Sequence, residues 1–195
     1  MFRGFNMNIH SALYIDDIPT FINDFLNYKP AEGKNKPSLK VLLIDIIAQR
    51  KNFSKIDPEL LLILLIKQSN INPVFLDDLL FRESASCGWL NAVSYLLEFK
   101  GTGVMAVNNQ AIIEASKNGH IDIVRVLMES KKITQFRIDD NPLSTAFLNN
   151  HINICQLLLQ YKVTQDLFYN KFFQYKKDIT TAINLLDLSK KIQEF

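Results

Sequence analysis

The sequence predicts an all-α fold in which short helix pairs stack into a solenoid. Three observations predict it. One segment recurs at a constant spacing of 31 residues, and a period of about 20 to 50 residues is typical of stacked repeats. Apolar residues within each copy follow helical spacing. The chain has six glycines and six prolines, fewer than an all-β fold with many tight turns would need.

The composition indicates a single folded domain, at most with an extra terminal subdomain. Of the 195 residues, 48% are hydrophobic and 22% are charged, which excludes a disordered tail. The net charge of +2 is too small to indicate binding to nucleic acid or to a membrane surface. The longest apolar run, residues 60–66, is far shorter than the roughly 20 residues of a membrane span. We therefore expect a soluble protein.

Helices are expected before the repeats begin, near residues 19–27, 39–50, 58–67 and 73–87. Asp57-Pro58 and Asn72-Pro73 each place a capping residue before a proline, which is the pairing that starts helices. Between the first two helices, the charged segment 29–37 contains proline and glycine and is predicted to be a loop.

Three copies of the repeat follow. Gly88-Trp89, Gly119-His120 and Asn150-His151 fall at the same place in each copy. The middle copy is predicted to form two helices, at about 109–117 and 121–130, with Gly119 ending the first in a left-handed conformation. Because one such pair cannot bury its apolar face alone, the copies are expected to stack.

The residues of the middle copy resemble an ankyrin repeat, from Ala115 to Met128. Residues 141–146, Asn-Pro-Leu-Ser-Thr-Ala, are similar to the Thr-Pro-Leu-His-x-Ala opening of that family. The period is shorter than the family's usual length of about 33 residues, and the Gly-Ala-Asp-x-Asn sequence is absent, so truncated or irregular β-hairpin fingers are expected. The high content of Asn, Ile and Lys and the divergent repeats are similar to ankyrin proteins of amoebae and their intracellular bacteria.

This resemblance implies an ankyrin-type solenoid with atypical helical regions at both ends. We predict a helical N-terminal region over 1–72, within which 39–68 forms a possible degenerate repeat. Three ankyrin-like repeats are predicted over 73–163, and a capping helix pair over 164–195. Terminal repeats of solenoids are usually atypical because their outer face meets water.

Histidines and cysteines are the first residues from which an enzyme would have to be built. His120 and His151 lie one repeat apart, too far to share a metal, and we expect their rings to bind the neighbouring loop backbone. Cys155 falls at a core position, whereas Cys87 has no adjacent base. Two thiols without a disulfide framework or metal-ligand spacing indicate an intracellular, cytoplasmic protein. The N-terminal sequence lacks the pattern of a secretory signal peptide.

The paired acids do not predict catalysis either. Adjacent side chains on a helix diverge, so Asp17 and Asp140 are expected to begin helices or turns. The sequence contains no phosphate-binding glycine-rich loop and none of the common hydrolase, metalloprotease or kinase motifs. We expect a non-enzymatic protein without a metal or cofactor.

The ankyrin resemblance implies that a partner protein binds the concave surface. The first helices contribute Glu83, Ser86, Glu114, Lys117, Thr145, Leu148 and Asn149, and the preceding loops add Asn108, Asn109, Arg137, Asp139 and Asp140. We therefore expect a monomeric protein-protein interaction module, an adaptor or scaffold, that binds another protein and no nucleic acid.

Two alternatives stay open. Two adjoining aromatic stripes on one predicted helix either pack as a cap or form an exposed anchor for a partner or a second copy; they comprise Phe168, Tyr169, Phe172, Phe173 and Tyr175. The alternative function is a secreted bacterial effector acting on a host protein in the host cytosol, with its specific activity in residues 1–72.

Overall fold

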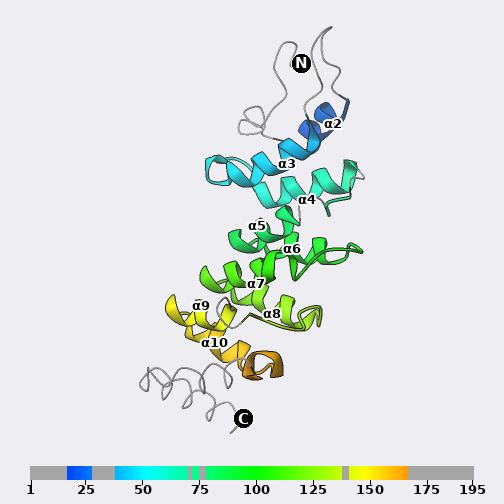
Figure 1. Cartoon of the computed structure of the whole chain (residues 1–195). Helices are drawn as coiled ribbons and strands as arrows, with labels where there is room; N and C mark the ends of the chain where they lie inside the picture. The colour runs from blue at the N-terminus through cyan, green and yellow to red at the C-terminus, as the bar shows by residue number, and fades with distance from the viewer. Residues whose placement is uncertain (1–16, 28–37, 70–71, 75–77, 138–140, 167–195) are drawn as a thin grey trace.

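The predicted all-α solenoid is confirmed. The computed structural model describes residues 17–27, 38–69, 72–74, 78–137 and 141–166, and none of these residues belongs to a β-strand. Their α-helices form one elongated stack (Figure 1). They are α2 (Ile18–Asn27), α3 (Leu39–Ala48), α4 (Pro58–Ser69), α5 (Leu79–Cys87), α6 (Leu90–Leu97), α7 (Ala106–Lys117), α8 (Ile121–Glu129), α9 (Pro142–Leu148) and α10 (Ile152–Leu158).

The helices form two parallel columns. From α3 onward, each odd-numbered helix packs beside the helix that follows it, so that α3–α4, α5–α6, α7–α8 and α9–α10 are pairs. Each odd helix also packs on the next odd helix, and each even helix on the next even one. The pair α3–α4 therefore contacts α5–α6 in the same succession that relates α5–α6 to α7–α8, and α2 extends the even column beyond α4 (Figure 1).

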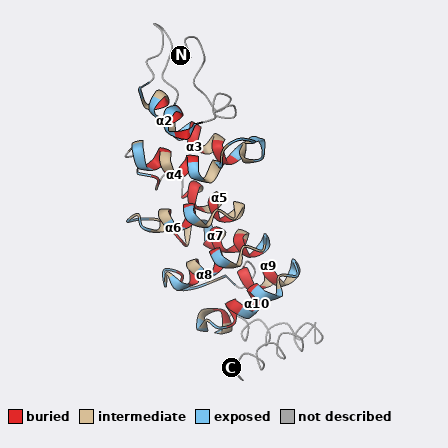
Figure 2. Cartoon of the chain, turned by 180° about the vertical axis from the view of Figure 1, so that it is seen from behind, coloured by how far each residue is buried: buried red, intermediate tan, exposed pale blue. Residues whose placement is uncertain are grey.

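Apolar residues at fixed repeat positions form the core between the layers. The buried residues run along the inside of the stack from α2 to α10 (Figure 2). Val93, Val124 and Cys155 occupy one repeat position and are each 0% exposed, which confirms the core position predicted for Cys155. Two further repeat positions are also buried in all three copies. One holds Ala92, Ile123 and Ile154, and the other holds Leu96, Leu127 and Leu158.

Side-chain caps begin the helices where the sequence predicts them. Asp17 precedes α2, and one of its carboxylate oxygens accepts the amide N–H of Thr20 at 3.1 Å. Asp57 and Asn141 precede α4 and α9, and each accepts an amide of the first turn at 2.9 Å. These side chains satisfy N–H groups that have no partner within the helix.

The helix predicted to begin at Pro73 starts later, so this prediction is wrong. The Asn72 side chain accepts the Val74 amide at 3.0 Å, but residues 72–74 are not helical and α5 begins at Leu79. Asp78 precedes this helix in a left-handed conformation, with a φ of 57°. It is buried and bonds to the amide of Gly103 at 2.9 Å. A tertiary contact, rather than the proline, therefore sets the start of α5.

The packing of α3 can be tested by removing one buried side chain. Leu43 is fully buried, so Leu43→Ala should lower the free energy of unfolding by about 2–5 kcal/mol. Val41 lies on the same helix but is 55% exposed, and Val41→Ala should change it by no more than about 0.5 kcal/mol. Urea unfolding followed by circular dichroism measures both. Equal effects would show that α3 does not pack on the stack as described.

Candidate functional site

Two histidines join each repeat to the one before it. Nε2 of His120 lies 3.1 Å from the carbonyl oxygen of Ser86, and Nε2 of His151 lies 3.0 Å from that of Lys117. A carbonyl oxygen only accepts, so Nε2 donates the proton in both bonds. Ser86 and Lys117 lie in the last turns of α5 and α7, whose carbonyls lack helical partners. The prediction that these rings bind neighbouring backbone is confirmed.

Glycine leaves the space that these rings occupy. Gly88 and Gly119 both have a φ of +82°, and the left-handed conformation predicted for Gly119 is confirmed. A Cβ at Gly88 would lie 2.7 Å from Cε1 of His120, and a Cβ at Gly119 would lie 2.7 Å from Cε1 of His151. The recurring glycine therefore meets two requirements, a left-handed backbone and room for the histidine of the next repeat.

The outer copies depart from this pattern. Asn150 replaces glycine with a φ of 60°, a conformation that asparagine adopts more readily than most residues. Trp89 replaces histidine and packs, partly buried, against the core. The start of α6 is instead joined to α4 by Glu59, whose carboxylate accepts the Ala92 amide at 2.8 Å. Sequence reasoning missed Glu59 because no short motif connects it with a helix 33 residues away.

Residues 84–171 match the family model of ankyrin repeats, in three copies. These residues are ankyrin repeats. Ankyrin repeats are typically protein-protein interaction modules, and the match indicates such a module over these residues. No curated protein and no solved structure matches the chain. The resemblance to ankyrin proteins of amoebae and their intracellular bacteria stays a prediction.

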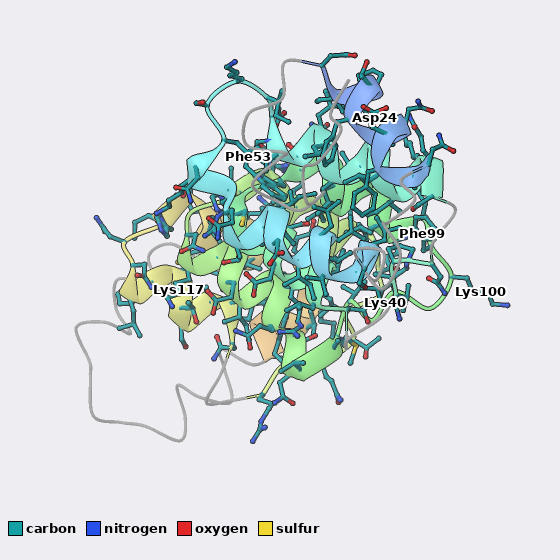
Figure 3. The ribbon with its side chains drawn as sticks, turned by 90° about the horizontal axis from the view of Figure 1, so that it is seen from above. Asp24, Lys40, Phe53, Phe99, Lys100 and Lys117 are labelled. Carbon is teal, nitrogen blue, oxygen red and sulfur yellow. The ribbon has the colours of Figure 1, made fainter. Side chains whose placement is uncertain are left out.

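The predicted partner-binding residues of the ankyrin first helices lie on α5, on α7, and on or just after α9. We call them the first-helix face. Lys117, Leu148 and Asn149 are exposed, and Leu148 is the most exposed large apolar residue described, at 82%. The other four are partly buried: Glu83, Ser86, Glu114 and Thr145. Lys117 lies on the opposite side of the stack from Lys100, which follows α6 (Figure 3).

Polar contacts hold several side chains of this face in place. The Glu114 carboxylate accepts a hydrogen bond from Gln110 at 2.9 Å, and its other oxygen lies 3.8 Å from the Lys117 ammonium. The Asn149 side chain donates to the Thr145 carbonyl at 2.8 Å. The exposed ion pair contributes little stability, but these contacts limit the conformations that each side chain adopts.

The residues predicted to lie in the loops of the ankyrin surface differ in their exposure to solvent. Asn108 and Arg137 are exposed. Asn109 is only 4% exposed, and its side chain donates to the Gln135 carbonyl at 3.0 Å. Its inclusion among the partner-binding residues is wrong, because this bond ties the first turn of α7 to the segment after α8 and leaves the side chain almost inaccessible.

The remaining predicted site residues lie outside the described residues. These are the loop acids Asp139 and Asp140 and the aromatic residues Phe168, Tyr169, Phe172, Phe173 and Tyr175. The described residues hold no group of three or more His, Cys, Asp or Glu side chains placed to bind a metal ion. In the part of the chain that the structure describes, no helix combines the length and apolar character that crossing a bilayer requires.

Both thiols favour their protonated form. Burial raises the pKa of Cys155 to about 11. Burial also raises the pKa of Cys87, an effect that nearby Arg50 opposes and Glu83 reinforces. Since the thiolate is the nucleophile, neither residue is activated for covalent chemistry near neutral pH.

The fit between glycine and histidine predicts an unequal response to two alanine substitutions. Gly88 and Gly101 both have positive φ values, but nothing lies within 4 Å of a Cβ at Gly101. Gly88→Ala should therefore cost about 1–3 kcal/mol more than Gly101→Ala in urea unfolding, because only Gly88→Ala collides with His120. The difference should shrink in a His120→Ala background. An unchanged difference would show that the ring does not occupy this space.

The thiols should also differ in reactivity. With a disulfide reagent at neutral pH, the partly buried Cys87 should react slowly and Cys155, 0% exposed, only after urea unfolds the chain. A Cys87→Ser variant assigns the first phase. Rapid reaction of Cys155 in the folded chain would contradict the burial of this core position.

Proposed function

We propose that the chain is a non-enzymatic adaptor that holds a folded partner, or a segment of one, on the first-helix face. In the ankyrin family this side of the stack is concave. The proposal places recognition on α5, α7 and α9 and assigns no catalytic step to the chain. A cytoplasmic location and a monomeric state remain part of the proposal.

One observation carries it: the same repeat frame has constant residues inside and varied residues outside. The core position of Val93, Val124 and Cys155 is fully buried and holds small apolar side chains in every copy. One position of the first helix instead differs between the copies. It holds Ser86, Lys117 and Leu148, spaced 31 residues apart, which present a hydroxyl, a cation and an apolar group. A regular scaffold that presents different chemistry at equal steps suits recognition of one irregular surface.

The rigidity of this face supports the same function. Ser86 accepts from both His120 and Asn118, and the Lys117 backbone accepts from His151. These bonds hold the ends of α5 and α7 against the repeats that follow. Because side chains on a fixed backbone lose little conformational entropy on binding, more of the contact energy is available for affinity.

The test compares two triple alanine variants with equal numbers of substitutions. The first replaces Glu114, Lys117 and Asn149 on the first-helix face. The control replaces the exposed residues Ser94, Arg125 and Gln156, which share one repeat position on α6, α8 and α10. Affinity capture from eukaryotic cytosol, quantified by mass spectrometry, identifies the proteins that the unmodified chain retains, and the affinity of each is then measured by calorimetry.

We expect the first-helix variant to bind the captured protein at least about tenfold more weakly, since a combined loss of about 1.4 kcal/mol over the three truncated side chains corresponds to tenfold in affinity. The control variant should bind it normally. Circular dichroism should show that both variants remain folded. Normal binding by the first-helix variant, or an equal loss in the control, would place recognition elsewhere on the molecule.

A further inference from the structure

The turn between α7 and α8 contains the dipeptide Asn118-Gly119. Asparagine followed by glycine is the sequence in which a backbone amide most readily attacks the preceding side chain, because glycine has no Cβ to obstruct it. Asn118 is exposed, so water and hydroxide reach it. The corresponding dipeptides of the other copies are Cys87-Gly88 and Asn149-Asn150. Among the described repeats, only the middle one combines both residue types.

The attacking group, the Gly119 amide, donates no backbone hydrogen bond within the part of the chain that the structure describes. The amide of Gly88 donates to the Ala85 carbonyl at 3.4 Å, and the amide of Asn150 donates to the Phe147 carbonyl at 3.0 Å. Gly119 occupies the same place in its repeat, yet its amide makes no backbone hydrogen bond among the described residues. The nucleophile of the reaction is therefore not held by the helix that precedes it.

The attacked group, in contrast, is held by two contacts. The Asn118 side-chain amide donates to the Ser86 carbonyl at 2.9 Å and lies 3.2 Å from the Ser86 hydroxyl. The Asn118 backbone has a ψ of 1°, and ring closure requires this angle to rotate. The His151 ring packs against Gly119 and resists that rotation.

We propose that Asn118-Gly119 is a deamidation site whose reaction is controlled by the contacts on either side of α7. These are the contacts of Asn118 with Ser86 and of the His151 ring with Gly119, and we call them the joints. The Gly119 nitrogen forms a bond to Cγ of Asn118 and transfers its proton to solvent base, and the side-chain nitrogen leaves as ammonia. Water then opens the resulting five-membered imide at either carbonyl. The product at position 118 is aspartate or isoaspartate, and no oxidant or reductant is required.

The modification in turn weakens the joints that control it. A carboxylate at position 118 has no proton to donate, so an anionic oxygen faces the Ser86 carbonyl where an amide donor was. Isoaspartate also adds a carbon to the backbone and displaces Gly119 from beneath the His151 ring. Deamidation therefore loosens the contact of α7 with α5 on one side and with α9 on the other, and it is irreversible.

The rate test uses the full chain at mildly alkaline pH, with peptide mass spectrometry of the segment that contains residue 118. His151→Ala should deamidate roughly fivefold faster than the unmodified chain, because the joint opens more often when its hydrogen bond is lost. Leu43→Ala lowers stability at a distant layer and is the matched control. Asn118→Gln should remove the product and confirm the assignment.

Three outcomes of the rate test would overturn the proposal. The first is a folded chain that deamidates as fast as a chain unfolded in urea, which would mean that the joints do not control the reaction. The second is a His151→Ala variant that reacts no faster than the unmodified chain. The third is an equal acceleration in Leu43→Ala, which would assign control to global unfolding.

Urea unfolding of two Asn118 variants independently tests whether deamidation weakens the contact between residue 118 and Ser86. Asn118→Ala and Asn118→Asp both lose the donor to Ser86, but only the aspartate variant places a negative charge beside that carbonyl. Asn118→Asp should therefore unfold at a lower urea concentration than Asn118→Ala. An equal or higher midpoint for Asn118→Asp would contradict the proposed weakening of the joint.

Discussion

Apolar packing between consecutive helix pairs is the interaction on which the rest of the structure depends. The helices are short, and α9 and α10 have seven residues each. Isolated helices of this length are not stable in water, because the cost of forming the first turn is not recovered. Leu127 and Leu158, both fully buried, show where the compensation arises. Each pair is helical because its neighbours cover its apolar side.

Packing alone does not specify how one pair sits on the next, because burial of apolar area has no direction. The polar joints supply the direction. A bond from His120 to Ser86 forms only when α7–α8 lies at one distance and one register from α5. The glycine at position 88 makes that approach possible, and the His151 bond repeats the arrangement one layer later. The residues that make these contacts between repeats serve the scaffold, which leaves other exposed side chains of the first helices free to vary.

Much of this architecture could be predicted, because the repeat period displays it three times. The helix pairs, the Gly-His turns and the core position of Cys155 follow from spacing alone. The position of α5 could not be predicted in the same way. Its start depends on a bond between Asp78 and Gly103, residues 25 positions apart. The proline at position 73 predicted an earlier start. This prediction failed because local capping preferences are weak beside a buried tertiary contact.

The sequence by itself determined which segments become helices and which of their faces are apolar, because side chains within one or two turns decide capping and amphipathic spacing. It also determined the period at which the pairs stack. Only the tertiary structure decided that Asn109 is buried, that Glu59 joins α4 to α6, and that the side chain of Asn118 is held by Ser86. Each of these depends on atoms that come from different layers. No local sequence pattern encodes a contact between two layers, so such a contact forms only once the layers have packed.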